Sequence, residues 1–203
     1  LGRDLERQLT TLSDQSIAFM CHGTDVRRPS LNRGRTPWAP IGDPHADRRQ
    51  EVYARRNLEL LARWDRPVFV STPDLIDDVP QGQWCPVVVD MDMWAAERGR
   101  TDRPVRVVHA PSKAGVKGSQ HIEPVLVELA ARGVIEYVPV RGVPHAQMPE
   151  VFAAADIVVD QMSNGIYGVG ACESMAAGCV VVSHVTERTR AIVAERTGLR
   201  LPI

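Results

Sequence analysis

Lysine is almost absent from this chain of 203 residues. Of its 24 lysine and arginine residues, only Lys113 and Lys117 are lysines, and both lie in one short stretch beside glycines. The bias towards arginine indicates genome composition rather than function, so the two lysines are the basic residues that require a functional explanation. The formal net charge of -1 gives no electrostatic basis for binding nucleic acid.

The sequence also lacks long apolar runs and paired cysteines. No apolar stretch approaches the roughly 20 residues of a membrane-spanning helix, and no signal peptide opens the sequence. Four cysteines occur without a C-x-x-C pair or zinc-ligand spacing: Cys21, Cys85, Cys172 and Cys179. We therefore expect reduced thiols in a cytoplasmic protein that has no membrane span, with peripheral membrane contact left open.

Apolar runs in the sequence alternate with helical patterns. The runs are continuous, as expected for parallel strands that helices cover on both faces. They read SIAFMCHG, PVFVS, WCPVVVD, VRVVHAP, IEYVPV, DIVVDQ and CVVVSHV. In the second half they predict a doubly wound, Rossmann-like domain in an α/β protein. A polar segment, AAERGRTDRP, predicts a boundary between a domain of residues 1–95 and one of 96–203.

Helical spacing and turn residues fill the gaps between the runs. Residues 25–47 are rich in Pro, Arg, Gly and Asp and predict a long loop, and 48–64 predict a helix that buries Val52 and Leu61 on one side. The helix after VRVVHAP carries Ile122, Val125 and Leu126 on its apolar face. Further helices are expected over 3–13, 149–155 and 186–197.

The segment SKAGVKGS follows VRVVHAP, at the carboxyl end of a predicted strand. Ligands of open parallel sheets bind at this edge. Glycines let backbone amides approach an anion, the next helix begins there, and Lys117 adds a mobile cation. An ordinary turn with a solvated lysine explains the same residues.

A second glycine loop, MSNGIYGVGACE, follows the predicted strand DIVVDQ. Gly165, Gly168 and Gly170 suit a turn that approaches a ligand closely. Glu173 falls in the first turns of the next helix, where its carboxylate can accept hydrogen bonds from both hydroxyls of a ribose. The alternative is that Glu173 only favours the positive end of that helix.

These segments resemble the donor-binding domain of retaining, nucleotide-sugar-dependent glycosyltransferases of the GT-B architecture. The likeness rests on VKGSQHIEPVLVELAARG, PHAQMPEVFAAADIVVDQ and GIYGVGACESMAAGCVVVSHV. It implies that Lys117 and Gly118 contact the donor diphosphate and that Glu173 holds the ribose. Ile166, Tyr167 and Gly168 would then lie along the donor phosphates and sugar.

The first half resembles the same family more weakly. FMCHGTDVR is similar to a strand end in the acceptor domain, where a histidine faces the donor sugar. The likeness therefore assigns catalytic roles to His22 and Lys117, although His22 fits equally well as a histidine bonded to a loop carbonyl. Family members also begin with further strands and end with a returning helix. We therefore expect an internal fragment with an incomplete first domain, inactive and poorly soluble alone.

Two positions depart from the family pattern. Many members carry a glutamate where this chain has Gly165, so a contact near the sugar is lost or supplied by backbone. An arginine often occupies the position of Ser112, and Lys113 offers a replacement for its charge. Ser112 and Gly165 nevertheless belong to the expected donor site.

The resemblance implies a hexosyl-type glycosyltransferase. It would move a sugar from a nucleoside-diphosphate sugar to a sugar, lipid or small-molecule acceptor, with retained configuration and without metal or cofactor. A sugar-nucleotide epimerase of the same fold is one alternative, with His22 and His145 as candidate groups. A metal-dependent glycosyltransferase using Asp90 and Asp92 is another, and a non-catalytic nucleotide-binding module is a third.

Overall fold

The computed structural model describes residues 2–12, 15–32, 34–38, 44–97, 99 and 102–203. The chain forms two compact units: one of Leu1–Arg33 and Ile41–Pro86, and one of Gly34–Pro40 and Val87–Ile203. The division between Pro86 and Val87 precedes the polar segment in which the sequence predicts the boundary. Both units are α/β, as predicted, and each contains one parallel sheet.

The first unit is built on a three-stranded sheet in the order β1-β2-β3. Its elements are α1 (Gly2–Thr11), β1 (Phe19–Cys21), α2 (Gly23–Val26), α3 (Pro29–Asn32), α4 (Pro44–Trp64), β2 (Val68–Val70), η1 (Pro73–Asp77) and β3 (Gln83–Trp84). Val70 of β2, Leu61 of α4 and Leu75 of η1 are buried together in its core. The apolar sides of short strands and a long amphipathic helix therefore hold this unit together.

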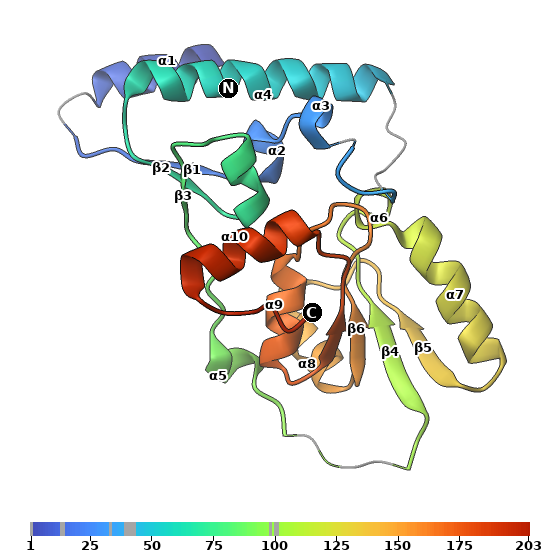
Figure 1. The fold of residues 1–203 in the computed structure, drawn as a ribbon. Coiled ribbons are helices and arrows are strands. Elements are labelled where there is room, and N and C mark those ends of the chain that lie inside the picture. Colours follow the sequence, from blue (N-terminus) through green and yellow to red (C-terminus); the bar gives the residue numbers. More distant parts are fainter. Residues whose placement is uncertain (1, 13–14, 33, 39–43, 98, 100–101) are drawn as a thin grey trace. The chain divides into compact units, whose positions relative to one another are not determined.

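The second unit contains a four-stranded parallel sheet in the order β5-β4-β6-β7. Its elements are α5 (Met91–Trp94), β4 (Val105–His109), α6 (Ala114–Lys117), α7 (Ser119–Ala131), β5 (Ile135–Pro139), η2 (His145–Gln147), α8 (Met148–Ala153), β6 (Ile157–Val159), α9 (Val169–Ala176), β7 (Val180–Val182) and α10 (Glu187–Thr197). In Figure 1, α7 runs along β5 beside the central strands β4 and β6. None of the helices in the described residues has the length and hydrophobicity needed to cross a bilayer.

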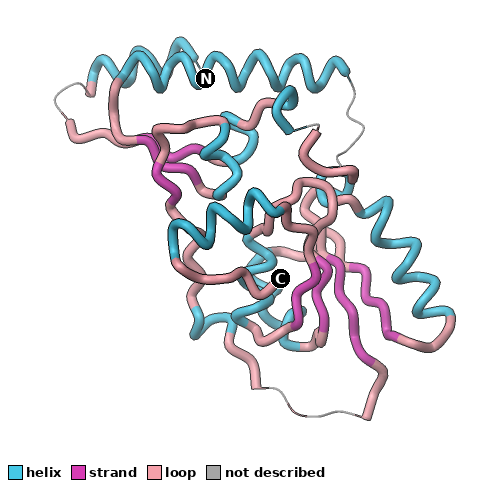
Figure 2. The backbone as a smooth tube through the Cα atoms, in the orientation of Figure 1, coloured by secondary structure: helices cyan, strands magenta, loops and turns pink. Residues whose placement is uncertain are grey.

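Successive residues of the central strands face opposite sides of this sheet, and both sides are buried. Val107 and Val159 pack with Ile122 of α7 in one cluster. Val108 packs with Phe152 of α8 in another cluster, which also contains Trp94 of α5. Since side chains alternate along a strand, an unbroken apolar run is what a strand covered on both faces requires. This arrangement confirms the doubly wound, Rossmann-like fold of the second half, visible as the four adjacent strands in Figure 2.

The run WCPVVVD is wrong as a full strand. Only Gln83 and Trp84 pair in β3, and Val88 is 91% exposed. Pro86 has no backbone N–H to donate to a sheet ladder, so pairing stops before it. The rest of the run leads into α5.

Other sequence expectations fail in detail. The predicted loop over 25–47 contains part of α2, all of α3 and the start of α4, while 33 and 39–43 lie outside the described residues. Val52 and Val125 were expected on buried helix faces but are 63% and 55% exposed. The other residues expected on these faces, Leu61 of α4 and Ile122 and Leu126 of α7, are buried.

A buried histidine joins three elements at the carboxyl end of the sheet. His109 ends β4 and is fully buried. Its Nδ1 lies 2.8 Å from the carbonyl oxygen of Val159 on β6, and its Nε2 lies 2.8 Å from Oγ of Ser119, the first residue of α7. A carbonyl can only accept, so Nδ1 carries the proton and Nε2 accepts from the serine hydroxyl. This neutral form satisfies every polar atom of the ring.

We predict that His109 makes the stability of the chain depend on pH. Burial lowers the pKa of His109 below its ordinary value of 6.5. As the pH falls through that value, the unfolded state takes up the proton before the folded state does, so the free energy of unfolding decreases. Urea unfolding of the wild type and of His109→Asn between pH 8 and pH 5 measures this effect. The variant should lose less of its own stability on acidification, and equal losses in the two proteins would contradict the prediction.

Candidate functional site

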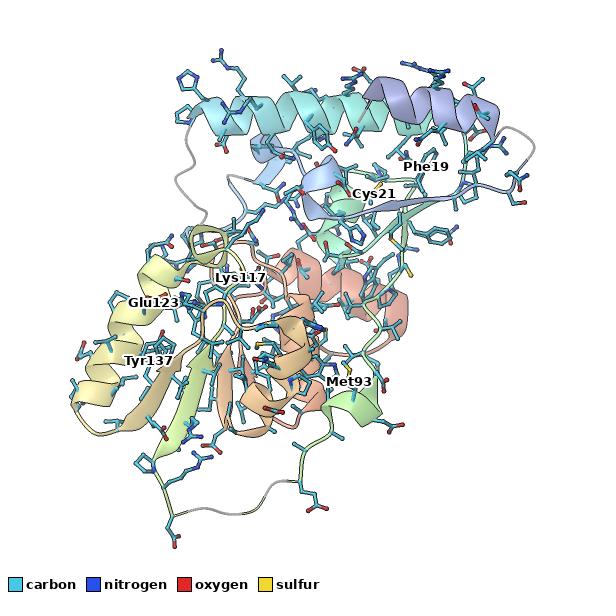
Figure 3. The ribbon with its side chains drawn as sticks, turned by 180° about the vertical axis from the view of Figure 1, so that it is seen from behind. Phe19, Cys21, Met93, Lys117, Glu123 and Tyr137 are labelled. Atoms are coloured by element: carbon cyan, nitrogen blue, oxygen red, sulfur yellow. The ribbon has the colours of Figure 1, made fainter. Side chains whose placement is uncertain are left out.

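A cavity of about 520 Å³ opens at the carboxyl ends of the strands of the second unit. Its lining comes from the segments after β4 (Ala110, Pro111, Ser112, Lys117), after β5 (Val140, Gly142, Val143, His145), after β6 (Asp160) and from α8 and α9 (Met148, Phe152, Val169, Gly170, Glu173). Strands that run parallel end at one edge, so loops far apart in sequence meet there. Figure 3 shows Lys117 at this edge of the sheet, away from Tyr137 on β5.

Four ionisable side chains line the cavity among the described residues. They are Lys117, His145, Asp160 and Glu173. One cation therefore faces two carboxylates when the imidazole is neutral. Both carboxyl residues are largely buried, at 7% exposure for Asp160 and 8% for Glu173.

Asp160 binds two donors at once. Its Oδ1 lies 2.5 Å from Nζ of Lys117, and its Oδ2 accepts a hydrogen bond of 2.8 Å from the backbone N–H of Gly168. Gly168 is the N-cap of α9. A Cβ at residue 168 would lie 2.5 Å from the lysine Nζ, so a side chain there would displace the ammonium group. Asp160, which follows β6, thereby holds the side chain of Lys117 next to the start of α9.

Glu173 of α9 is held by His145, the first residue of η2. Nε2 of His145 lies 2.7 Å from Oε1 of Glu173, and it must be the donor because a carboxylate only accepts. The ring of His145 also makes an edge contact with Trp94, with the ring centroids 5.6 Å apart. Trp94 is buried in the core, so it gives the exposed histidine a fixed support.

Buried polar groups fix the shape of the glycine loop between β6 and α9. The amide of Gln161 donates to the carbonyl oxygens of Ile166 and His184, while its oxygen accepts from the N–H of Asn164. The carbonyl of Gly165 accepts from the N–H of Thr186 and from the hydroxyl of Thr189. These bonds tie the loop to the start of α10.

Gly165 of this loop adopts a backbone conformation that favours glycine. Its φ is +66°, and a Cβ there would lie 2.5 Å from Cγ2 of Thr186. A glutamate does not fit this backbone, so the loop is built for glycine at this position.

The structure brings some of the expected donor residues together. Ser112, Lys117 and Glu173 line the cavity, and Gly118 and Gly168 adjoin it through Lys117. Gly165, Ile166 and Tyr167 lie in the loop between β6 and α9 but not in the described lining of the cavity, and Ile166 is 7% exposed. His22 belongs to the first unit, where it is the N-cap of α2 and its backbone N–H bonds to Asp25.

No protein-family model matches this chain, and no curated protein matches it. A solved structure that does match is a sucrose-phosphate synthase from Thermosynechococcus elongatus. The TM-score is 0.52 at 14% identity, and the match covers 93% of this chain and 56% of that one. The likeness supports the GT-B fold expected from the sequence. The chain spans little more than half the length of that protein.

Asp160 is not among the site residues predicted from the sequence, and His145 is predicted only as a candidate group of the epimerase alternative. Both follow predicted strands, which is the same position that drew attention to Ser112 and Gly165. An acidic residue directly after an apolar run, as in DIVVDQ, is the signal that would have found Asp160. Its partners are 43 and 8 residues away, so only the fold reveals what it holds.

Asp90 of the alternative metal-ligand pair Asp90 and Asp92 caps a short helix. Oδ1 of Asp90 accepts from the backbone N–H of Asp92 at 3.1 Å and of Met93 at 3.3 Å. Asp90 is thus the N-cap of α5, a position that favours aspartate in any protein. The D-x-D pattern has a sufficient explanation in helix capping.

We predict that Gly118→Ala distorts the site, whereas Gly115→Ala is tolerated. Gly118 joins α6 to α7 with φ +80°, and a Cβ there would lie 2.6 Å from Oγ of the buried Ser163. The left-handed backbone alone costs a non-glycine residue about 1–2 kcal/mol, and the close contact adds to this. Gly115 has no atom within 4 Å of its Cβ position and provides the matched control. Urea unfolding checks the pair, and equal stabilities of the two variants would refute the prediction.

Proposed function

We propose that the second unit binds a nucleoside-diphosphate sugar and that the protein transfers the sugar to an acceptor. The observation that carries the proposal is the position of the Lys117 ammonium beside Gly168, the N-cap of α9, in the lining of a cavity. A cation and the N-terminus of a helix both favour an anion. Their meeting at the carboxyl edge of a parallel sheet is a suitable place for a diphosphate.

The chemical task of such a site is to stabilise the departing diphosphate. The ammonium of Lys117 and the backbone N–H groups at the start of α9 supply positive charge where negative charge develops. Asp160 holds both in place before the ligand binds, so little reorganisation is needed. In this proposal the configuration at the sugar is retained, and the lysine and helix take the place of a metal ion.

Glu173 would bind the ribose. His145 occupies Oε1, which leaves Oε2 as an acceptor towards the cavity. A carboxylate has about four acceptor positions, so one bond to histidine still permits bonds to two hydroxyls. The apolar lining from Val140, Val143 and Phe152 offers surface to the rest of the nucleoside.

The structural neighbour agrees with this proposal. It is named as a synthase of sucrose phosphate, which fits hexosyl transfer. The acceptor of this chain is a sugar, a lipid or a small molecule in our proposal. His22 keeps its proposed catalytic role on the acceptor side, and Ser112 and Gly118 keep theirs beside the diphosphate.

One observation favours a second candidate function. The pair of His145 and Glu173 places an imidazole and a carboxylate in the same cavity, which is the equipment of a proton transfer in a sugar-nucleotide epimerase. Product analysis after incubation with a nucleotide sugar separates the two functions. Transfer or release of the sugar supports our proposal, and an inverted epimer replaces it.

We predict that Glu173→Ala weakens the binding of a nucleotide sugar by about 1–3 kcal/mol, or roughly 5- to 150-fold. The variant removes charge-assisted hydrogen bonds to the ribose. Calorimetric titration of the chain with UDP-, GDP- and ADP-glucose identifies the base and measures the loss. Glu150→Ala on α8, where the glutamate is exposed and outside the cavity lining, is the control and should bind like the wild type. Unchanged affinity in Glu173→Ala would remove the ribose role.

A further prediction concerns metal ions. Because Lys117 and the start of α9 already supply positive charge, we expect binding and sugar release from the donor to survive EDTA. The measurement is the rate at which the longer enzyme implied by the resemblance releases nucleoside diphosphate from the chosen donor, with and without chelator. If EDTA abolishes release and Mn²⁺ restores it, the alternative with Asp90 and Asp92 gains the support that our proposal loses.

A further inference from the structure

The charge of the cavity is unusual for a site proposed to hold a diphosphate. Its only full cation in the described lining is Lys117, and that ammonium is bound to the carboxylate of Asp160. With Glu173 the lining carries two carboxylates and one ammonium. A ligand with several negative charges therefore gains less attraction here than a lysine-lined pocket would give.

The pair of Lys117 and Asp160 is sheltered from solvent. The lysine side chain is 18% exposed and that of Asp160 is 5% exposed. Salt and water screen charges weakly at such depth, so the negative charge of Asp160 acts on whatever binds beside the lysine. Oδ2 is also fixed, because it accepts from the N–H of Gly168. The carboxylate cannot turn away from the ammonium without giving up this bond.

The field of these carboxylates reaches the helix that the ligand would touch. Cys172 lies one residue before Glu173 on α9. Burial raises the pKa of the Cys172 thiol, and the charges of Asp160 and then Glu173 raise it further. A second anion at this place is thus disfavoured by the residues around it.

A donor and its product differ in charge at the phosphate that adjoins the sugar. In a nucleoside-diphosphate sugar both phosphates are esterified, and each carries about one negative charge. The free nucleoside diphosphate ends in a terminal phosphate whose last proton has a pKa of about 6, as in a phosphate monoester, so it carries nearly one further charge at pH 7. A fixed carboxylate near this phosphate therefore repels the free nucleoside diphosphate more than its sugar ester and lowers its relative affinity.

We propose that Asp160 is a specificity-determining residue, which favours a diphosphate esterified at both ends over one with a free terminal phosphate. This inference rests on the proposed function and deepens it. Because Asp160 uses part of the attraction of Lys117, the additional charge of the free diphosphate gains less here than it would beside an unpaired ammonium. The same effect speeds release of the nucleoside diphosphate once the sugar has left.

The test compares two ligands in four proteins. The ligands are the tightest binder among UDP-, GDP- and ADP-glucose and the nucleoside diphosphate with the same base. The proteins are the wild type, Asp160→Asn, Lys117→Met and the double variant. Calorimetric titration gives the ratio of the two dissociation constants in each. The ratio cancels losses common to both ligands, including any caused by a displaced Gly168 or lysine.

The ratio should follow the charge of the pair. In Asp160→Asn the free diphosphate should gain about five- to tenfold relative to its sugar ester, as expected for one unit charge a few ångströms away in a partly screened site. In Lys117→Met it should lose by a similar factor. The double variant, with no charge at either position, should return to within about twofold of the wild type.

Asp160→Glu keeps the charge and serves as the matched control, with a ratio close to that of the wild type. Asp156→Asn, at the other end of β6, controls for removal of an acidic group outside the cavity. A ratio that stays within twofold in both single variants overturns the inference, and so does a gain in Lys117→Met. If the wild type binds none of the three sugar nucleotides, the proposed function fails first. Binding with an unchanged ratio leaves that function standing and removes only the role of Asp160.

Discussion

The arrangement of the cavity depends on the carboxylate of Asp160. It is the residue that follows β6, and its two oxygens reach the loop after β4 and the start of α9. The backbone repeats the connection, because the N–H of Met162 donates to the carbonyl of Lys117 at 3.0 Å. Two loops that share no sequence neighbourhood are therefore locked side by side. These two contacts, and not the flexible lysine side chain itself, fix the position of Lys117.

Hydrogen bonds among buried polar groups hold the loops in place, whereas apolar packing holds the sheet. Gln161 is 1% exposed and bonds both inside its own loop and to the segment after β7. His109 does the same between β4, β6 and α7. Buried polar groups that are fully bonded fix one geometry, since any shift leaves a donor or acceptor unpaired at a cost of about 1–3 kcal/mol. In this unit the polar edge thus allows one loop geometry, whereas the apolar core tolerates small shifts in packing.

This division explains what the sequence could predict. The strands of the second unit were found because burial on both faces leaves a continuous apolar run, and their ends marked the edge where Ser112, Lys117 and Glu173 meet. WCPVVVD misled because an apolar run is also possible in a chain segment that crosses between units, with Val88 in solvent. Val52 and Val125 misled because helical spacing defines the buried face only approximately, and residues at the edge of that face remain in solvent. Asp160 and His145 could not be assigned from the sequence, since their roles consist of single contacts with distant residues.

The same contacts restrict the class of ligand more than the fold does. Lys117 offers attraction to an anion, but Asp160 uses part of it, so a compact anion such as phosphate has little to gain in the cavity. Glu173 needs donors rather than charge, because it already carries a negative charge and accepts from His145. A ligand that satisfies both must combine a modest negative charge with hydroxyl groups some distance from it. The nucleoside-diphosphate sugar of our proposal has this pattern, with the hydroxyl groups on its ribose. This requirement follows from the charges of the second unit alone.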